Sequence, residues 1–402
     1  MPHLAAALFL LLSVSIATHA QIDENCGSQV SVTTEADLAA VADCTSFSGT
    51  LTVSGTSLSS LSWPALTSLT GSISISSNAN LNVFSLDGLE SSTGSISLFN
   101  NTILSAFNVP NLETINVLEI VTAPNLRQLP LPSVHSLNTL KIEDTGLDNS
   151  GALPWTSLLK ITDLGVSNNK YLTAIDMPSL TTVLGRFVIA ANGLMEGKGQ
   201  GSSLHLNNLT SVSNCTLRHL TDIEVPALTS VGASLAFDET NIKDIVVPNL
   251  RTVGQTLSIV SNNLLGNVSF GELTTIGGAL LIANNTELTT IDGFGKLKDI
   301  AGVLNMRGAF ATVSLPAVST VQGGMSVLSS TNFDCTTLSK VKANARGKTI
   351  CQANVKSARP TNADGSEIQD SAAPGSLLVK AREQGSLWMA LAVLSYAVYN
   401  IL

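Results

Sequence analysis

The sequence offers few side chains whose type and spacing suit catalysis or metal binding. Three histidines lie after residue 20, at His135, His205 and His219. They are far apart along the chain, and no two of them have the spacing of zinc ligands or of a Ser-His-Asp triad. From the sequence alone we therefore predict no metal site, no cofactor and no histidine-based catalysis.

Two pairs of acidic residues remain as candidates for acid–base chemistry: Asp144 with Asp148, and Asp238 with Glu239. Two carboxylates can act as general acid and general base when their surroundings hold their pKa values apart. Such residues are more common in solvated turns, and we interpret both pairs in that way. The glycine-rich run at 197–201 lacks the rest of a phosphate-binding motif and is interpreted as an inserted loop. The sequence thus predicts a protein that is not an enzyme.

A repeated strand pattern must position these side chains. Between about residues 66 and 333, two apolar residues separated by one position recur, followed by a polar and a further apolar residue. The second apolar residue of each copy falls at Ile75, Leu98, Ile120, Ile142, Val166, Ile189, Leu217, Phe237, Ile259, Ile282, Met306 and Val327. The period of about 22 to 23 residues lies in the range of leucine-rich repeats. A solenoid is therefore predicted.

Each copy has the pattern of a strand with one buried face. Ile73 and Ile75 alternate with Ser72, Ser74 and Ser76, so successive side chains point to opposite sides. One turn cannot bury its apolar face alone, and neighbouring turns must stack around a shared core. Prolines between the copies mark corners, and the segments between corners lack helical periodicity. We predict a mostly β, right-handed, leucine-rich-repeat-like solenoid of about 12 turns.

Asparagine recurs three residues after the second apolar position in six of the twelve copies. These residues are Asn78, Asn101, Asn169, Asn192, Asn262 and Asn285. Their side-chain amides would suit a buried ladder that bonds backbone groups at the bend after each strand. The alternative is a series of turn asparagines on the surface.

A helix signal precedes the first copy. Residues 34–42 carry Glu35 and Asp37 in the expected first turn, and Thr33 or Thr34 could cap that turn. Because the end of a solenoid exposes an apolar edge, we expect this segment to form a short N-terminal cap helix.

The cysteines favour a secreted protein with stapled ends. Cys26 and Cys44 bracket the expected helix, and Cys335 and Cys351 bracket the segment after the last copy. Since the ends of a long solenoid lie far apart, we expect a disulfide within each pair. Cys215 occupies a core position in its copy and is interpreted as a small buried apolar side chain. An intermolecular disulfide or a reactive thiol is the alternative.

Both ends of the chain resemble processing signals. Residues 1–20 contain an apolar run followed by a small-residue cleavage site, which predicts a secretory signal peptide. The apolar tail at 387–402 follows a polar spacer and a stretch of small residues, which matches a glycosylphosphatidylinositol (GPI) attachment signal. We place the attachment at Ser371, with Gly375 as the alternative; an ordinary tail anchor is the competing interpretation.

Five sequons allow N-glycosylation: Asn100, Asn208, Asn214, Asn267 and Asn284. Asn100 and Asn284 each precede a ladder asparagine, where the side chain should face solvent, and they are the preferred sites. Asn214 is a weaker candidate because it lies beside a core position.

The formal net charge is −9 at pH 7, which argues against binding nucleic acid or an anionic membrane through charge. Outward positions of the copies are mostly Ser, Thr, Ala or Gly. Charged residues among them are Glu119, Lys141, Arg218 and Arg307. Aromatic residues make up only 4% of the chain, so a sugar-binding platform has little support. Its candidate locations are the surroundings of Trp63, Trp155 and Phe99.

The repeat at 248–259 and the closing Asn332-Phe333-Asp334-Cys335, together with both cysteine pairs, resemble the fungal cell-wall organisation proteins of the sporulation-specific/extracellular-mutant family. This resemblance implies a receptor L-domain-like solenoid, a GPI lipid anchor, a role in wall integrity and no catalytic residue. Many members have a long Ser/Thr-rich stalk, whereas only a short, partly basic stem precedes the anchor here. Residence at the outer leaflet of the plasma membrane is therefore expected over covalent linkage to the wall.

The expected organisation is a signal peptide (1–20), an N-terminal cap (21–57), solenoid repeats (58–333), a C-terminal cap (334–355), a short stem (356–371) and a propeptide removed on anchoring (372–402). We predict a GPI-anchored cell-surface glycoprotein that supports wall organisation, with wall polysaccharides or wall proteins as partners. A receptor-like solenoid for a secreted protein, peptide or glycan is the first alternative. A wall-remodelling enzyme is the second, and it would need two carboxylates about 5 to 10 Å apart in a groove.

Overall fold

The computed structural model describes residues 24–150, 155–194 and 201–355. The predicted signal peptide, the stem, the attachment residue Ser371 with its alternative Gly375, and the propeptide all lie outside the described residues. Within the described residues, no helix combines the length and the apolar composition needed to cross a membrane.

The largest sheet contains a main ladder with one strand in each turn. Its strands are β1 (Gln29–Val32), β3 (Thr50–Ser54), β6 (Ser72–Ser76), β8 (Ser91–Phe99), β10 (Thr114–Ala123), β11 (Ser136–Thr145), β13 (Asp163–Ser167), β15 (Thr182–Ala190), β17 (Ser211–Arg218), β20 (Leu235–Asp238), β23 (Leu257–Val260), β26 (Leu280–Ala283), β29 (Leu304–Gly308), β32 (Met325–Ser329) and β33 (Thr349–Gln352). Each strand pairs in parallel with the next one named.

Shorter strands complete the turns. A second row in the same sheet comprises β2 (Ser46–Phe47), β5 (Ser68–Leu69), β12 (Lys160–Ile161), β19 (Ser230–Val231), β22 (Thr252–Val253), β25 (Thr275–Ile276), β28 (Asp299–Ile300) and β31 (Thr320–Val321). Four small parallel sheets contain β4 (Ser60–Ser62), β7 (Val83–Ser85) and β9 (Ala106–Asn108); β14 (Ala174–Asp176), β16 (Ser202–His205) and β18 (Leu220–Glu224); β21 (Asp244–Val246) and β24 (Asn267–Ser269); and β27 (Thr290–Ile291) and β30 (Thr312–Val313).

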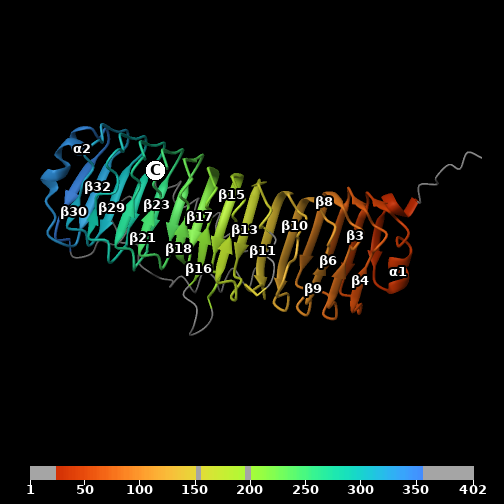
Figure 1. Ribbon diagram of the computed structural model, residues 1–402. Coiled ribbons are helices and arrows are strands. Elements are labelled where there is room, and N and C mark those ends of the chain that lie inside the picture. The colour runs from red at the N-terminus through yellow and green to blue at the C-terminus, as the bar shows by residue number, and fades with distance from the viewer. Residues whose placement is uncertain (1–23, 151–154, 195–200, 356–402) are drawn as a thin grey trace, which may run out of the picture.

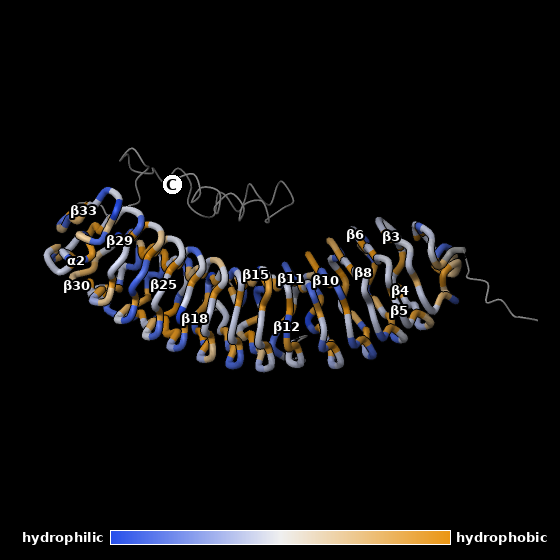
Figure 2. Tube along the Cα trace, turned by 90° about the horizontal axis from the view of Figure 1, so that it is seen from above, coloured by the Kyte–Doolittle hydropathy of each residue, from blue (hydrophilic) through white to orange (hydrophobic). Residues whose placement is uncertain are grey.

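Together these strands form one elongated parallel β-solenoid of about 14 turns (Figure 1). Strands account for 43% of the structure and helices for 5%, so the prediction of a mostly β solenoid is confirmed. The solenoid is curved, with β6, β10 and β15 on the inside of the curve and β18 on the outside (Figure 2). The outward side of the main ladder therefore forms a concave surface.

The register of the ladder aligns the predicted repeat. Ile75 pairs with Leu98, and Ile259 pairs with Ile282, so the second apolar residues stack in one buried column. The prediction of about 12 turns was too low. Strands β1 and β3 lie in the segment expected to be the N-terminal cap, and β33 lies in the expected C-terminal cap. The alternation in Thr50–Ser54 continues the same pattern, and this copy was missed.

Aromatic side chains fill the interior of the solenoid. Phe84 stacks on Phe107 with ring centroids 5.1 Å apart, and Phe270 stacks on Phe294 at 5.3 Å. Contacts of this kind between neighbouring turns contribute about 1 kcal/mol each beyond the burial of their surface. Trp63 and Trp155 are also fully buried, at 1% and 0% exposure. Neither tryptophan can offer a face to a sugar, which removes two of the three predicted platform locations.

The asparagine ladder is confirmed, and its surface alternative is wrong. All six asparagines are at most 3% exposed. Each side-chain amide donates to the backbone carbonyl of the second apolar residue in the preceding turn, as Asn262 Nδ2 does to Phe237 O at 2.8 Å. These bonds satisfy carbonyls that would otherwise be buried without a partner at the bend.

A buried threonine begins each ladder, which gives three Thr-Asn-Asn ladders across successive turns. They are Thr56-Asn78-Asn101, Thr145-Asn169-Asn192 and Thr240-Asn262-Asn285. In the third, the backbone N–H and Oγ1 of Thr240 donate to Asn262 Oδ1 at 2.8 and 2.6 Å. Apolar residues, Ala123 and Leu220, occupy the equivalent positions between ladders. The threonines were not recognised in the sequence.

The residue before each ladder position adopts a left-handed backbone conformation. From Gly55 to Asn284 this holds in eleven consecutive turns, with φ between 53° and 63°. Gly55 and Asn100 adopt it, and so do Thr122 and Glu239. In residues other than glycine, the Cβ makes this conformation sterically unfavourable. The stacking of turns therefore imposes this bend, whatever the residue type.

Both ends of the described chain carry a disulfide. At the N-terminal end, η1 (Glu24–Gly27) and α1 (Glu35–Ala39) lie beside a bond between Cys26 and Cys44. Helix α1 falls within the expected 34–42 segment, but its role as a cap stays a prediction. At the C-terminal end, η2 (Cys335–Leu338) and α2 (Ser339–Ala343) lie between β32 and β33, the last two strands of the ladder.

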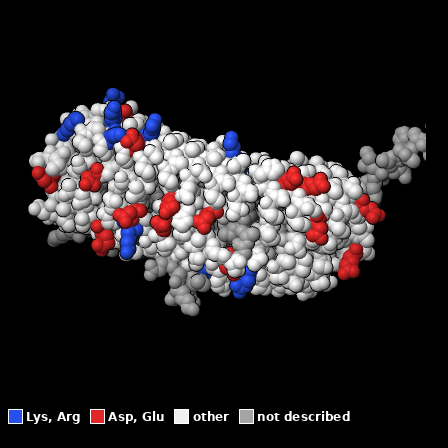
Figure 3. Space-filling model, in the orientation of Figure 1, with Lys and Arg blue, Asp and Glu red and all other residues white. Residues whose placement is uncertain are grey.

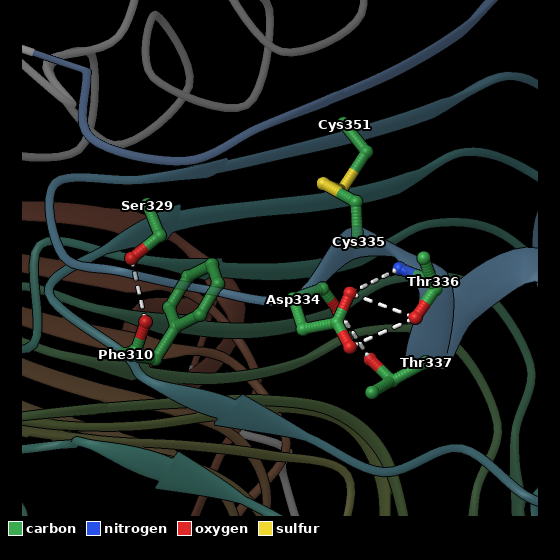
Figure 4. Close-up of a disulfide and its surroundings, with 7 residues drawn as sticks. All are labelled: Phe310, Ser329, Asp334, Cys335, Thr336, Thr337 and Cys351. Atoms are coloured by element: carbon green, nitrogen blue, oxygen red, sulfur yellow. Dashed lines mark hydrogen bonds between the residues drawn. A yellow bond between two sulfur atoms is a disulfide. The ribbon is translucent and has the colours of Figure 1, made fainter.

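Figure 4 shows the C-terminal end in detail. A disulfide joins Cys335, at the start of η2, to Cys351 in β33. The Asp334 carboxylate accepts a hydrogen bond from the backbone N–H of Thr336 at 2.9 Å, which caps η2. Since β33 pairs with β32, the disulfide ties the short helices to the last turn of the ladder.

Cys215 is a free thiol at a core position of β17, where it pairs with Phe187 and Leu235 in the neighbouring strands. Its exposure is 4%, and burial raises its pKa. A thiol held in the neutral form and away from solvent behaves as a small apolar side chain, which supports the interpretation made from the sequence.

Candidate functional site

The outward side of the main ladder is a regular surface to which each turn adds one strand. At its N-terminal end, hydroxyls form rows that run from turn to turn: Ser72 Oγ donates to Thr50 Oγ1 at 3.3 Å and Ser76 Oγ donates to Ser54 Oγ at 3.1 Å. Neighbouring strands of a sheet are about 4.8 Å apart, so these hydroxyls repeat at that interval. The surface there is polar and uncharged.

The middle of this surface carries a cluster that we call the central charged patch: Glu119, Lys141, Glu143, Asp163 and Arg186. Glu119 of β10 pairs in register with Lys141 of β11. Lys141 Nζ lies 3.2 Å from Glu143 Oε2, with both side chains only 12–13% exposed. The sequence suggested scattered charges, and Figure 3 shows charged side chains dispersed among uncharged ones on one face of the molecule. In the patch, however, the ladder brings residues 22 to 23 positions apart side by side.

A shallow hollow of about 360 Å³ lies within the central charged patch. It is lined by Glu119, Thr139, Leu140, Lys141, Asp163, Leu164, Gly165 and Arg186. Gly165 pairs with Lys141 on one side and Val188 on the other, so one row of outward side chains is interrupted there. The backbone N–H of Arg186 donates to Asp163 Oδ1 at 2.7 Å and fixes one wall.

A second charged group follows on β17 and β20. Arg218 Nη2 lies 2.8 Å from Glu239 Oε2, and Ser258 Oγ donates to Asp238 Oδ1 at 3.1 Å. Burial raises the pKa of Asp238 to about 6, although the nearby Arg218 partly opposes the shift. Burial also lowers the pKa of His219, which lies 3.7 Å from Glu239.

The interpretation of Asp238 and Glu239 as solvated turn residues was wrong for Asp238, which ends strand β20 and is half-buried. Its raised pKa resembles that of a general acid. Both carboxylates already have protein partners, Ser258 and Arg218, and this pair does not line the hollow of the central charged patch. The other acidic pair fits its interpretation better, since Asp144 is exposed at a bend and Asp148 bonds Ser150.

The histidines lie in three different environments. His135 is exposed, and His219 belongs to the group around Arg218. His205 lies among Asp176, Asp222 and Glu224 in the small sheet of β14, β16 and β18. This cluster was not recognised in the sequence because its members come from three different strands.

The predicted glycosylation sites differ in their surroundings. Asn100, Asn208, Asn214 and Asn267 are exposed, and Asn284 is half-buried. Asn208 Nδ2 donates to the backbone carbonyl of Pro178 at 2.6 Å, so this amide already holds a corner between two turns. Asn214 pairs with Arg186 on the outward side of the ladder, so a glycan there would lie beside the central charged patch. Which sites carry glycans stays a prediction.

Comparisons with known proteins point to fungal cell surfaces. The chain is 28% identical to protein ecm33 of Aspergillus fumigatus, over 90% of this chain and 89% of the relative. It is 31% identical to the cell wall mannoprotein PST1 of Saccharomyces cerevisiae, over 76% of this chain and 66% of the relative. It is 30% identical to a cell surface GPI-anchored protein of Arthroderma benhamiae, over 55% of each.

The chain spans only about half the length of the Arthroderma relative, so the matched region does not cover that whole protein. No family profile and no solved structure matches the chain. The match to ecm33 nevertheless extends over nearly the whole chain, and the solenoid makes up most of that length. The chain therefore belongs to the family of fungal cell-surface and cell-wall proteins that includes ecm33, mannoprotein PST1 and their GPI-anchored relatives.

Proposed function

We propose that this protein is a GPI-anchored cell-surface glycoprotein that supports the organisation and integrity of the fungal cell wall without catalysing a reaction. The observation that carries the proposal is the match to ecm33 over 90% of this chain. The carboxylates of Asp238 and Glu239 are engaged by Ser258 and Arg218, which is in keeping with a non-catalytic role.

The solenoid supports such a role by its shape. It presents an outward sheet of about 14 turns, with hydroxyl rows at one end and the central charged patch in the middle. An extended polymer can contact many turns at once, and many weak contacts then add up to useful affinity. Wall polysaccharides or wall proteins are the partners that we propose for this surface.

The anchor is part of the same proposal. Attachment at Ser371 would leave a short stem between the last turn of the ladder and the lipid. A solenoid on a short stem would stay close to the outer leaflet of the plasma membrane. The GPI lipid is therefore the first partner of the protein, and covalent transfer to wall glucan is the alternative.

The central charged patch favours a second candidate function, a receptor-like solenoid that binds a secreted protein, peptide or glycan. The hollow has charges of both signs, from Glu119, Lys141, Asp163 and Arg186, around the gap left by Gly165. Such a combination fixes the orientation of a small polar ligand better than it holds a uniform polymer.

Release from intact cells tests the anchor. Phosphatidylinositol-specific phospholipase and glucanase would be applied in parallel, followed by mass determination of the C-terminal peptide. Release by phospholipase with a peptide that ends at Ser371 or Gly375 would support the anchor at the membrane. Release by glucanase alone would move the protein into the wall, and an intact chain through Leu402 would overturn the lipid anchor.

Complementation tests the role in the wall. A strain that lacks the gene would be scored for sensitivity to wall-binding dyes, then supplied with the wild-type chain or with a double variant, Glu119→Ala with Lys141→Ala. Rescue by both would support a scaffold that acts through the whole surface. Rescue by the wild type alone, with normal amounts of the folded variant at the surface, would favour the receptor-like alternative. No sensitivity in the deletion strain would contradict both.

A further inference from the structure

We propose that His205, Asp222 and Glu224 bind one divalent transition-metal ion, with Asp176 orienting the histidine. The site lies on the small sheet of β14, β16 and β18, apart from the central charged patch on the main ladder. The proposal does not depend on the proposed function of the protein.

The strands place these side chains in register. Asp176, His205 and Glu224 are successive partners across β14, β16 and β18. Asp222 lies two residues before Glu224 on β18, and side chains two positions apart in a strand point to the same side. The alternating residues Ile175, Leu204 and Ile223 are buried, which turns the polar side chains outward. The candidate ligands therefore stand on paired strands rather than on loops.

The ligand atoms are close enough for one ion. One nitrogen of His205 and one carboxylate oxygen from each of Asp222 and Glu224 lie within 4.8 Å of one another. Ligands at about 2.0 to 2.2 Å from a zinc ion are roughly 3 to 4 Å apart, so only small side-chain movements are needed. The carboxylate of Asp222 is 60% exposed and has room to move.

Asp176 forms a hydrogen bond with the other ring nitrogen of His205. Its Oδ1 lies 2.5 Å from His205 Nδ1, while His205 Nε2 faces Asp222 Oδ2 at 3.6 Å. When Nδ1 donates its proton to Asp176, Nε2 keeps a lone pair that points toward the other two carboxylates. A carboxylate that receives the second ring N–H is a regular feature of metal-binding histidines, because it fixes the ring and raises its basicity.

The charges around the site favour a cation. Three carboxylates face one imidazole, and in the described part of the chain neither Asp222 nor Glu224 forms an ion pair with a lysine or arginine. A dication would neutralise this surplus of negative charge. A proton on Nε2 would compete for the same position, so binding should weaken in acid.

The donor set indicates the class of metal. One imidazole nitrogen and two carboxylate oxygens suit Zn²⁺ or Mn²⁺, whereas Ca²⁺ and Mg²⁺ prefer all-oxygen sites. Water would complete the coordination of a site with three protein ligands. The ion would join two consecutive strands near the longest step of the repeat, between Ile189 and Leu217, and we assign it no reaction.

Isothermal titration calorimetry with Zn²⁺ on the full-length glycosylated protein, stripped by a chelator, tests the site. We expect one saturable equivalent in the wild type. His205→Gln should weaken binding about 100-fold, and Asp176→Asn should weaken it about 10-fold because it acts through the ring. His135→Gln, which removes an exposed histidine elsewhere on the solenoid, is the matched control and should bind as the wild type does.

Thermal unfolding gives an independent readout. A ligand that binds only the folded state raises the unfolding temperature, so Zn²⁺ should stabilise the wild type and His135→Gln but not His205→Gln. In the presence of a chelator, the His205→Gln variant should unfold within a few degrees of the wild-type temperature, which would show that the variant folds. Equal Zn²⁺ binding by His205→Gln and the wild type, no saturable binding by the wild type, or a response to Ca²⁺ in place of Zn²⁺ would each overturn the proposal.

Discussion

The Thr-Asn-Asn ladders and the central charged patch both connect neighbouring turns through polar side chains, but under opposite conditions. In the ladders, buried amides donate to carbonyls at the bend and accept from the turn before them. In the patch, charged side chains lie on the outward side of the ladder, partly shielded from solvent, and pair along or across strands. Fully buried polar groups must be satisfied within the protein, whereas partly exposed ones keep water as an alternative partner. The ladders therefore stabilise the fold, whereas the fold depends less on the pairs in the patch.

The largest loss of stability should follow when the middle asparagine of a ladder is replaced. Asn262→Ala removes the acceptor of Thr240 and the donor to Phe237, and leaves both groups buried. We expect the free energy of unfolding to fall by about 4 kcal/mol, because each unsatisfied buried group costs about 1 to 3 kcal/mol. Urea denaturation measures the loss. Asn263→Ala, at the exposed neighbouring position, is the control, and an equal loss there would contradict the comparison.

The pH dependence of stability should reveal the raised pKa of Asp238. Its folded-state pKa is raised to about 6 from an ordinary 3.8, so the folded protein binds the proton more tightly than the unfolded chain does. Stability should therefore fall as the pH rises from about 4 to 6, by up to about 3 kcal/mol. Asp238→Asn should remove this dependence and unfold at higher urea than the wild type at pH 7. A pH profile for the variant that matches the wild type would show that Asp238 is not desolvated.

The first residue of a ladder should matter less than its middle. Thr240→Val keeps the shape and the backbone bond to Asn262 Oδ1 but removes the hydroxyl donor. The expected loss in unfolding free energy is about 1 kcal/mol, the net value of one hydrogen bond. Thr240→Ser keeps the hydroxyl and should recover part of that loss. If Thr240→Val lowered the unfolding free energy as much as Asn262→Ala does, the hydrogen bonds of a ladder would be lost together and not one by one.

The smallest effects should come from charge pairs. Lys141→Ala leaves Glu143 and Glu119 without their cationic neighbour in a region that is mostly shielded from solvent, and should cost about 1 kcal/mol in unfolding free energy. The matched control is Lys296→Ala, whose pair with Glu272 is far more exposed, at 57% and 41%. That variant should change stability by less than about 0.5 kcal/mol. The reverse order would mean that burial does not decide the strength of these pairs.

The interior of the solenoid was largely predictable from the sequence. The alternation around Ile73 and Ile75 and the recurring Asn78 gave the strand, its buried side and the ladder, because each signal lies within one turn. The extra turns were missed since β1, β3 and β33 lie in segments that were expected to be caps. A buried threonine such as Thr240 resembles any surface threonine until its partner is known.

The sequence by itself determined the repeat, the inward and outward sides of each strand and the shared family pattern, since these depend on the order of residues within a turn. Only the tertiary structure decided which outward side chains meet. Glu119 meets Lys141, and Asp176 meets His205, across turns whose lengths vary between 20 and 28 residues. A change of a few residues in one turn alters every contact with the next, so the charged patch and the histidine cluster depend on the register of the stacked strands.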